Sequence, residues 1–159
     1  MEVGKLEDKD NYIKKPTFIL RLSGEQFQSE IGCLGKQLAQ ILACIQDETS
    51  NFTWFAFDVF GSSNQPSEVL FPKPYSEILS TDELILKANE IVQFHSGVFI
   101  GIRKGKEIEW EIDILPETEE SEGLQHPEAE IEIRPFDTSY FEIYGMDISI
   151  ENKIKSSFM

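Results

Sequence analysis

Eleven carboxylates lie between residues 107 and 132, and no Lys or Arg interrupts them. Such a set could recognise positive charge, coordinate a hard cation such as Ca²⁺, or supply paired acids and bases. Within the segment, residues 107–114 and 128–133 alternate acids with apolar residues. Because successive side chains of a strand point to opposite faces, each run predicts a strand with one apolar face and one carboxylate face.

The geometry of a strand argues against metal binding or catalysis by these acids. Ca²⁺ takes six to eight oxygen ligands that surround it, whereas the acids of a strand lie in a row. The sequence also contains no Gly-rich phosphate loop, Cys/His cluster or nucleophile elbow. His95 is expected at a helix-to-strand junction, and His126 lies in an acidic loop unsuited to a catalytic base. We therefore predict a protein that is not an enzyme and has no cofactor and no metal site.

The uniform charge instead predicts a binding surface. A surface that needed only solubility would mix both signs, and like charges on neighbouring strands destabilise by about 0.2–1 kcal/mol per pair. We expect the carboxylate face to dock a basic protein surface, such as the nucleic-acid-binding cleft of a nuclease, with aromatic residues as anchors. The predicted partner-binding residues are Glu107, Glu109, Glu111, Asp113, Glu130, Glu132, Glu142, Phe99, Tyr140 and Tyr144.

Two other interpretations remain open from the sequence. The acids can form a solvated sheet face with a flexible loop at 115–128, without any partner. Alternatively, the chain is a small-molecule-binding or accessory domain with a pocket lined by the aromatic strand 52–60, which carries Phe52, Trp54, Phe57 and Phe60. Asp58 in that strand is either a pocket carboxylate or a paired or solvated residue at a strand end.

Composition limits the class of protein. The 159 residues carry a net charge of −15, which opposes direct binding to nucleic acid or to an anionic membrane. A hydrophobic content of 40% with twelve Phe excludes a disordered acidic tail. No apolar run reaches the roughly 18 residues of a membrane span, and no secretory signal is recognisable. With Cys33 and Cys44 expected to be reduced core residues, we predict a cytoplasmic location and leave the oligomeric state open.

In size, charge and class, the chain is similar to the small acidic inhibitor and immunity proteins with which bacteria neutralise toxic nucleases or other effectors. This resemblance assigns no residue, and it favours an inhibitor or immunity-type function.

The remaining elements follow from periodicity and capping signals. We expect a flexible arm at 1–15 and a single domain at 16–159. The spacing of Ser23 and Gln26 predicts a capping box, as does that of Ser80 and Glu83, and Asp147 is expected to cap a short terminal helix. The other predicted helices are 24–47, which would carry both cysteines, and 81–94. The predicted strands are 17–22, 52–61, 97–103, 107–114, 129–134 and 139–144, with a further edge strand at 69–71.

These elements predict an α+β fold. It has two layers, with two main helices on one face of a mostly antiparallel sheet and a short C-terminal helix. A three-residue turn at 104–106 would pair 97–103 with 107–114 and keep the apolar residues on one face. The opposite face of the C-terminal half would then be open and would carry the carboxylates.

Overall fold

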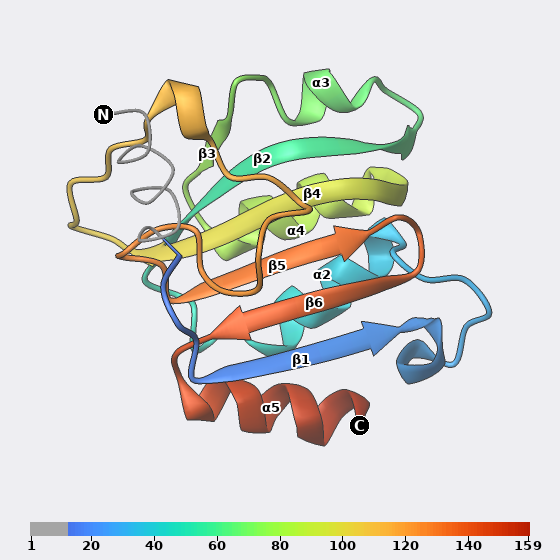
Figure 1. The fold of residues 1–159 in the computed structure, drawn as a ribbon. Coiled ribbons are helices and arrows are strands. Elements are labelled where there is room, and N and C mark those ends of the chain that lie inside the picture. Colours follow the sequence, from blue (N-terminus) through green and yellow to red (C-terminus); the bar gives the residue numbers. More distant parts are fainter. Residues whose placement is uncertain (1–12) are drawn as a thin grey trace.

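The computed structural model describes residues 13–159, which form one six-stranded sheet of order β1-β6-β5-β4-β2-β3 (Figure 1). All neighbouring strands are antiparallel. The strands are β1 (Phe18–Ser23), β2 (Phe52–Ser63), β3 (Ser76–Ile78), β4 (Ile91–Arg103), β5 (Ile131–Phe136) and β6 (Tyr140–Gly145). The helices are α2 (Gly35–Cys44), α3 (Ser67–Leu70), α4 (Thr81–Asn89) and α5 (Ile148–Phe158), with 3₁₀ turns η1 (Gly24–Phe27) and η2 (Ile112–Ile114). The predicted α+β fold is confirmed.

Helices α2, α4 and α5 pack on one face of the sheet, and this helix-covered face holds the larger apolar core. Leu38, Ile41 and Leu42 of α2 are fully buried there. Trp54 of β2 joins them, and its indole N–H donates to Thr81 Oγ1 at 2.9 Å. This face is built as its sequence pattern predicts, from the apolar stripe of a helix against alternate residues of strands.

A long loop, residues 104–130, crosses the opposite face between β4 and β5 (Figure 1). Its apolar side chains form a second core with Phe55, Phe57, Val98 and Ile100 of the sheet. The prediction of an open carboxylate face was therefore wrong: the sheet is covered on both sides.

The prediction of an acidic strand at 107–114 was also wrong. β4 pairs with β2 along one edge and with β5 along the other, where Ile100 lies opposite Glu132. Because β5 occupies the edge that the predicted hairpin required, residues 106–111 have no strand partner and run as irregular chain into η2. The second alternating run does form a strand, but β5 begins only at Ile131.

The predicted long helix 24–47 is interrupted. Ser23 and Gln26 form the expected capping box, yet η1 ends after one turn, at Gln28, whose φ is +55°. Cys33 also has a positive φ of 59°, and α2 starts only at Gly35. At Gly35 an added Cβ would lie 1.9 Å from the Ile91 carbonyl oxygen, so glycine permits a close approach of α2 to the start of β4. The two cysteines therefore do not share a helix.

Several other boundaries were corrected. Ser80 accepts from Glu83 N, but α4 ends at Asn89, and residues 91–94 of the predicted helix 81–94 belong to β4. Residues 67–70 form α3, so the edge strand is β3 and not 69–71. Asp147 caps α5 through Ser149 N, and strands 17–22, 52–61 and 139–144 correspond to β1, β2 and β6, as expected.

The aromatic strand β2 is covered on both faces, as predicted, because its residues divide between the two cores. A β-bulge at Asp58, where φ is +55°, shifts its register against β4. Phe57 packs in the second core, whereas Val59, two residues further on, packs in the first. The bulge therefore changes the face to which the strand directs its side chains.

The first 12 residues of the predicted N-terminal arm lie outside the described part of the chain. The remainder is held: Lys14 forms a two-bond backbone bridge with Leu124, with N···O distances of 2.7 and 2.9 Å. The Lys14 ammonium also donates to the carbonyls of Pro127 and Ala129. This bridge ties the start of the described chain to residue 124.

Candidate functional site

Residues 104–130, here called the acidic loop, lie with their apolar side chains against the sheet. Ile108 and Trp110 are partly buried in the second core, whereas Glu107, Glu109 and Glu111 are exposed. The alternation of acids and apolar residues is therefore real, but it marks an extended segment with one side on an apolar surface. It does not mark a strand in a ladder.

Trp110 packs the loop against the aromatic residues of β2. Its ring centroid lies 4.5 Å from that of Phe57, 5.3 Å from Phe55 and 4.6 Å from His126. Its indole N–H is buried and has no hydrogen-bond acceptor among residues 13–159. An unsatisfied buried donor costs about 1–3 kcal/mol, so the ring is held by packing alone.

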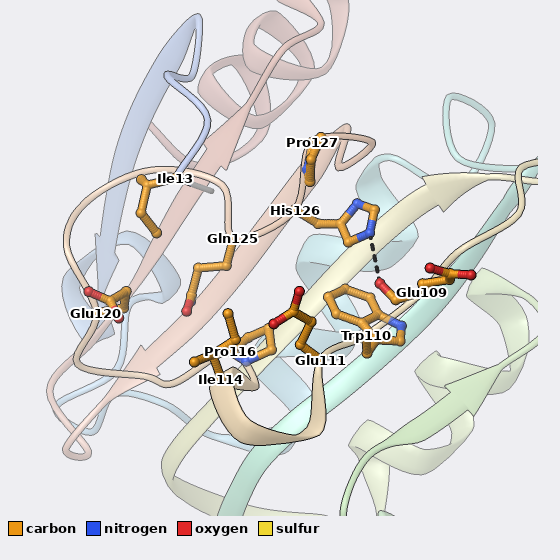
Figure 2. Close-up of a pocket in the computed structure, with 10 residues that line it drawn as sticks. All are labelled: Ile13, Glu109, Trp110, Glu111, Ile114, Pro116, Glu120, Gln125, His126 and Pro127. Atoms are coloured by element: carbon orange, nitrogen blue, oxygen red, sulfur yellow. Dashed lines mark hydrogen bonds between the residues drawn. The ribbon is translucent and has the colours of Figure 1, made fainter. Parts of the chain in front are cut away.

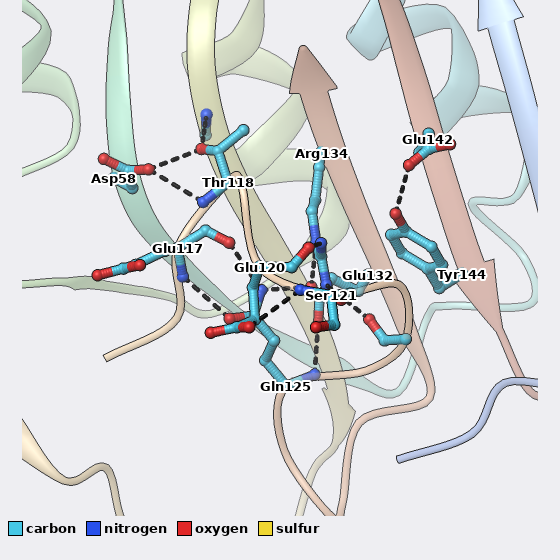
Figure 3. A network of polar contacts seen from close by, with 12 residues as sticks. Asp58, Glu117, Thr118, Glu120, Ser121, Gln125, Glu132, Arg134, Glu142 and Tyr144 are labelled. Atoms are coloured by element: carbon cyan, nitrogen blue, oxygen red, sulfur yellow. Dashed lines mark hydrogen bonds and ion pairs between the residues drawn. The ribbon is translucent and has the colours of Figure 1, made fainter. Parts of the chain in front are cut away.

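A buried ion pair holds the second half of the loop (Figure 3). Arg134 Nε lies 2.6 Å from Glu132 Oε2, and both side chains have an exposed fraction of 0%. The Arg134 guanidinium also donates to the carbonyl oxygens of Glu120, Ser121 and Gly123, at 2.8, 3.1 and 2.8 Å. We call this arrangement the loop clamp, since one guanidinium binds both the sheet and three carbonyls of the loop.

Gln125 completes the clamp from the loop side. Its backbone N–H donates to Glu132 Oε1 at 2.7 Å and its amide to Oε2 at 2.8 Å. Burial raises the pKa of Glu132 above its ordinary value, and the Arg134 charge with the Gln125 donors acts in the opposite direction. Both carboxylate oxygens are therefore bonded within the protein, and Glu132 is not available to a partner.

Two further polar groups on the sheet fix the loop and its surroundings. Asp58 Oδ2 accepts from Thr118 N at 3.0 Å and from Thr118 Oγ1 at 2.7 Å (Figure 3). Asp58 is thus a paired residue, although it lies at a mid-strand bulge and not at a strand end. Next to the clamp, Glu142 accepts from Arg21 at 2.7 Å and from the Tyr144 hydroxyl. Burial and this carboxylate raise the pKa of Tyr144.

His126 joins the two halves of the loop. Its Nδ1 accepts from Glu128 N at 3.0 Å, so Nε2 carries the proton and donates to the Glu109 carbonyl oxygen at 3.3 Å. Burial lowers the pKa of His126, with Lys14 acting in the same direction and the Glu109 carbonyl and the Glu128 charge acting against it. The half-buried ring is therefore neutral and joins residues 109 and 128 through its two hydrogen bonds.

A pocket of about 220 Å³ opens between these two halves (Figure 2). Apolar groups form most of its wall, and carboxylate residues and one amide complete it. The lining residues are Ile13, Glu109, Trp110, Glu111, Ile114, Pro116, Glu120, Gln125, His126 and Pro127.

The structure separates the residues predicted to bind a partner. Glu107, Glu109, Glu111 and Asp113 are exposed on the acidic loop. Glu130 is partly buried beside Arg103, at 3.4 Å, and Tyr140 is partly buried under the Arg21 guanidinium.

Four of the predicted residues are buried: Phe99, Glu132, Glu142 and Tyr144. The prediction that they stand on an exposed face was wrong, because the acidic loop and the apolar core cover them.

The aromatic residues of the alternative pocket are placed differently from one another. Phe52, Trp54 and Phe57 are core residues, while Phe60 is exposed by 43% at the rim of the sheet. Trp110, Gln125 and His126, which line the observed pocket, were not predicted as a site. The available signals were Pro116, Gly123 and Pro127, which favour a folded-back loop over a sheet, and Arg134, a lone cation after a long acidic run.

In residues 13–159, no group of three or more His, Cys, Asp or Glu side chains is placed to hold a metal ion. Likewise, no helix in this part of the chain has both the length and the apolar character that a membrane crossing needs.

Comparison of the chain with models of protein families, with curated proteins and with solved structures finds no match.

Proposed function

We propose that this chain is a non-enzymatic cytoplasmic binding protein, of the inhibitor or immunity type, whose acidic loop docks a basic surface of a partner protein. A nuclease, whose nucleic-acid-binding cleft is basic, is the kind of partner that fits. The observation that carries the proposal is a row of exposed carboxylates on a loop that hydrogen bonds and packing hold in place. We call these holding contacts the frame: the loop clamp, the Asp58–Thr118 bonds and the packing of Trp110. The interface is the loop itself and not the sheet face beneath it.

The frame supports binding because the loop is already ordered. The loop clamp, the Asp58–Thr118 bonds and the packing of Trp110 fix three separate parts of it. A partner would therefore spend little binding free energy on ordering the chain, which raises affinity.

Several exposed carboxylates of the acidic loop have no Lys or Arg partner within residues 13–159. Among the described residues, Glu107, Glu109, Asp113, Glu117 and Glu119 are exposed and form no ion pair with Lys or Arg. Mutual repulsion makes such a surface costly by itself, and a basic partner would relieve it.

The test compares two charge-neutralised proteins that have the same net charge. The first carries Glu107→Gln, Glu109→Gln, Asp113→Asn and Glu119→Gln on the acidic loop. The matched control carries Glu30→Gln, Glu68→Gln, Glu77→Gln and Glu90→Gln, four exposed acids elsewhere. Each protein is used to retain partners from native host extract at low salt, and association with the purified partner is then followed by stopped flow.

We expect the wild type and the control to retain one basic protein that the loop variant loses. Association should slow at least tenfold in the loop variant and should also slow as salt is added, because electrostatic attraction is screened. Equal loss in both variants would mean that only net charge matters, and it would contradict docking through the loop.

A further inference from the structure

The pocket between the two halves of the acidic loop lies where the described chain begins. Ile13 lines it together with Trp110, Ile114 and Pro116, as Figure 2 shows. Its volume of about 220 Å³ falls below the roughly 300–1,000 Å³ of pockets for drug-sized ligands. The pocket therefore suits a single side chain rather than a free small molecule.

The polar groups that line the pocket are already satisfied. The Gln125 amide donates to a carboxylate of β5 and to a loop carbonyl, and both ring nitrogens of His126 are bonded. Glu111 and Glu120 have interaction partners of their own, and Figure 2 shows the Glu109 carboxylate directed away from the space. What remains for an occupant is the apolar wall, so an apolar side chain fits the pocket best.

The chain enters the rim of this pocket at a fixed point. Lys14 is bridged to Leu124, and its ammonium donates to a further loop carbonyl at 2.9 Å. At Gly123, whose φ is +132°, an added Cβ would lie 2.7 Å from Ile13 Cγ2, so Ile13 packs directly on the loop backbone. Residues 1–12 are thus attached to the wall of the pocket itself.

This attachment favours the protein's own N-terminal segment over a free ligand. Twelve residues precede Ile13 and are tethered to it. A short flexible tether gives the attached group an effective concentration of roughly millimolar. A free side chain or peptide would have to exceed that concentration to occupy the pocket instead.

Leu6 is the side chain of this segment that best matches the pocket. The large apolar side chains among residues 1–12 are Met1, Val3, Leu6 and Tyr12. Tyr12 directly precedes Ile13, and neighbouring side chains of an extended chain point to opposite sides, so Tyr12 would be directed away from the pocket. The chain between Leu6 and Ile13 can span about 23 Å when extended, which is ample. Leu6 is also nearer than Met1 and Val3, and it has one methylene more than valine to bury.

We propose that residues 1–12 fold back over the acidic loop and seat Leu6 in this pocket, against Trp110, Ile114 and Pro116. The segment then acts as a strap that joins the two halves of the loop and closes the apolar opening between them. This inference concerns the pocket and not the exposed carboxylates, so it does not rest on the proposed function.

The first experiment looks for this contact by NMR in the full-length protein. We expect nuclear Overhauser contacts from the Leu6 methyl groups to the Trp110 ring and to Ile114, and none to Trp54, which is buried in the other core. The Leu6 amide should relax like the amides of the sheet. Absence of these contacts, with residues 2–11 relaxing as a flexible arm, would overturn the proposal.

A matched pair of variants tests the anchor. Leu6→Ser should shift the Trp110 indole N–H signal and leave that of Trp54, which is bonded to Thr81, in place. It should also raise acrylamide quenching of tryptophan fluorescence at least twofold, because Trp54 is fully buried and Trp110 gains access to solvent. Val3→Ser should change neither readout. Equal effects of the two substitutions would contradict Leu6 as the anchor.

A second pair of variants tests the wall. Ile114→Ser should release the segment, so that the Leu6 amide relaxes like a chain terminus, because Ile114 lines the pocket. Ile112→Ser, in the same 3₁₀ turn, should leave the segment docked, because Ile112 is 64% exposed and lies outside the lining. A segment that stays docked in the Ile114→Ser protein would contradict seating in this pocket.

Dilution separates a strap within one molecule from exchange between copies. We expect the Trp110 indole signal of the wild type to stay in place over a tenfold dilution, because an intramolecular contact does not depend on protein concentration. A signal that moves on dilution toward its position in the Leu6→Ser protein would show that the segment of a second copy fills the pocket, and the proposal would fail.

Discussion

The two faces of the sheet are covered by different means. Helices cover one face mainly with apolar side chains, whereas a loop without strands or long helices covers the other and is held by several hydrogen bonds and an ion pair. A helix satisfies its own backbone groups, so its cover can be purely apolar. The acidic loop leaves carbonyls to be satisfied, and Arg134 satisfies three of them from the sheet.

The sharpest test of this difference removes the clamp. Arg134→Met should lower the free energy of unfolding by about 3–5 kcal/mol, because it leaves Glu132 and three loop carbonyls buried without their donor. Urea denaturation measures the loss. The double variant Glu132→Leu with Arg134→Met should recover part of it, since no unpaired charge then remains. A single variant as stable as the wild type would show that the clamp does not hold the loop.

On the helix-covered face, the matching change is apolar. Ile41→Ala should cost about 3 kcal/mol, because Ile41 is fully buried and its truncation leaves a cavity. Hydrogen exchange should show amides of both faces losing protection together, as expected for global unfolding. Loss of protection confined to the helix-covered face would contradict this expectation and would mean that the two cores unfold independently.

The apolar part of the loop cover depends on Trp110. Trp110→Ala should cost about 2 kcal/mol, less than a fully buried tryptophan, since the ring is only partly covered. Trp110→Phe should change stability little, because it keeps a ring against Phe57 and removes the unsatisfied N–H. Limited proteolysis within 104–130 reports on the loop itself. Faster cleavage of the Phe variant than of the Ala variant would contradict this role.

The smallest expected effect is a pH dependence at His126. Its pKa is lowered in the folded protein, so the unfolded chain binds a proton more readily, and stability falls as the pH drops below about 6.5. Protonation of Nδ1 breaks the bond from Glu128 N, which is worth about 1 kcal/mol.

Exchange of the Glu128 amide, measured between pH 7 and pH 5, checks this prediction. It should accelerate in the wild type beyond the intrinsic pH trend. His126→Gln should abolish the pH-linked component, and His95→Gln, a change on β4 outside the acidic loop, should leave it intact. A pKa of His126 above 6.5 in the folded protein would contradict the prediction that burial lowers it.

Local sequence signals predicted much of the fold. The Ser23, Ser80 and Asp147 caps, the aromatic β2 and the β1 and β6 strands all follow from periodicity and capping, which depend on neighbouring residues. The α+β class followed from their order. The break in the predicted helix 24–47 could not be predicted in this way. Gly32 and Gly35 lie against the backbone of Ser139 and Ile91, and these contacts join residues far apart in the sequence.

The sequence by itself determined the charge of residues 107–132 and the alternation that puts Ile108 and Trp110 on one side and Glu107 and Glu109 on the other. Only the tertiary structure decided which carboxylates meet water. Glu132 and Glu111 both belong to alternating acidic runs. Glu132 lies on β5, where the acidic loop buries it beside Arg134, whereas Glu111 is exposed on the loop. Strand pairing joins residues far apart in the chain, so no local pattern could assign burial to one acid and exposure to the other.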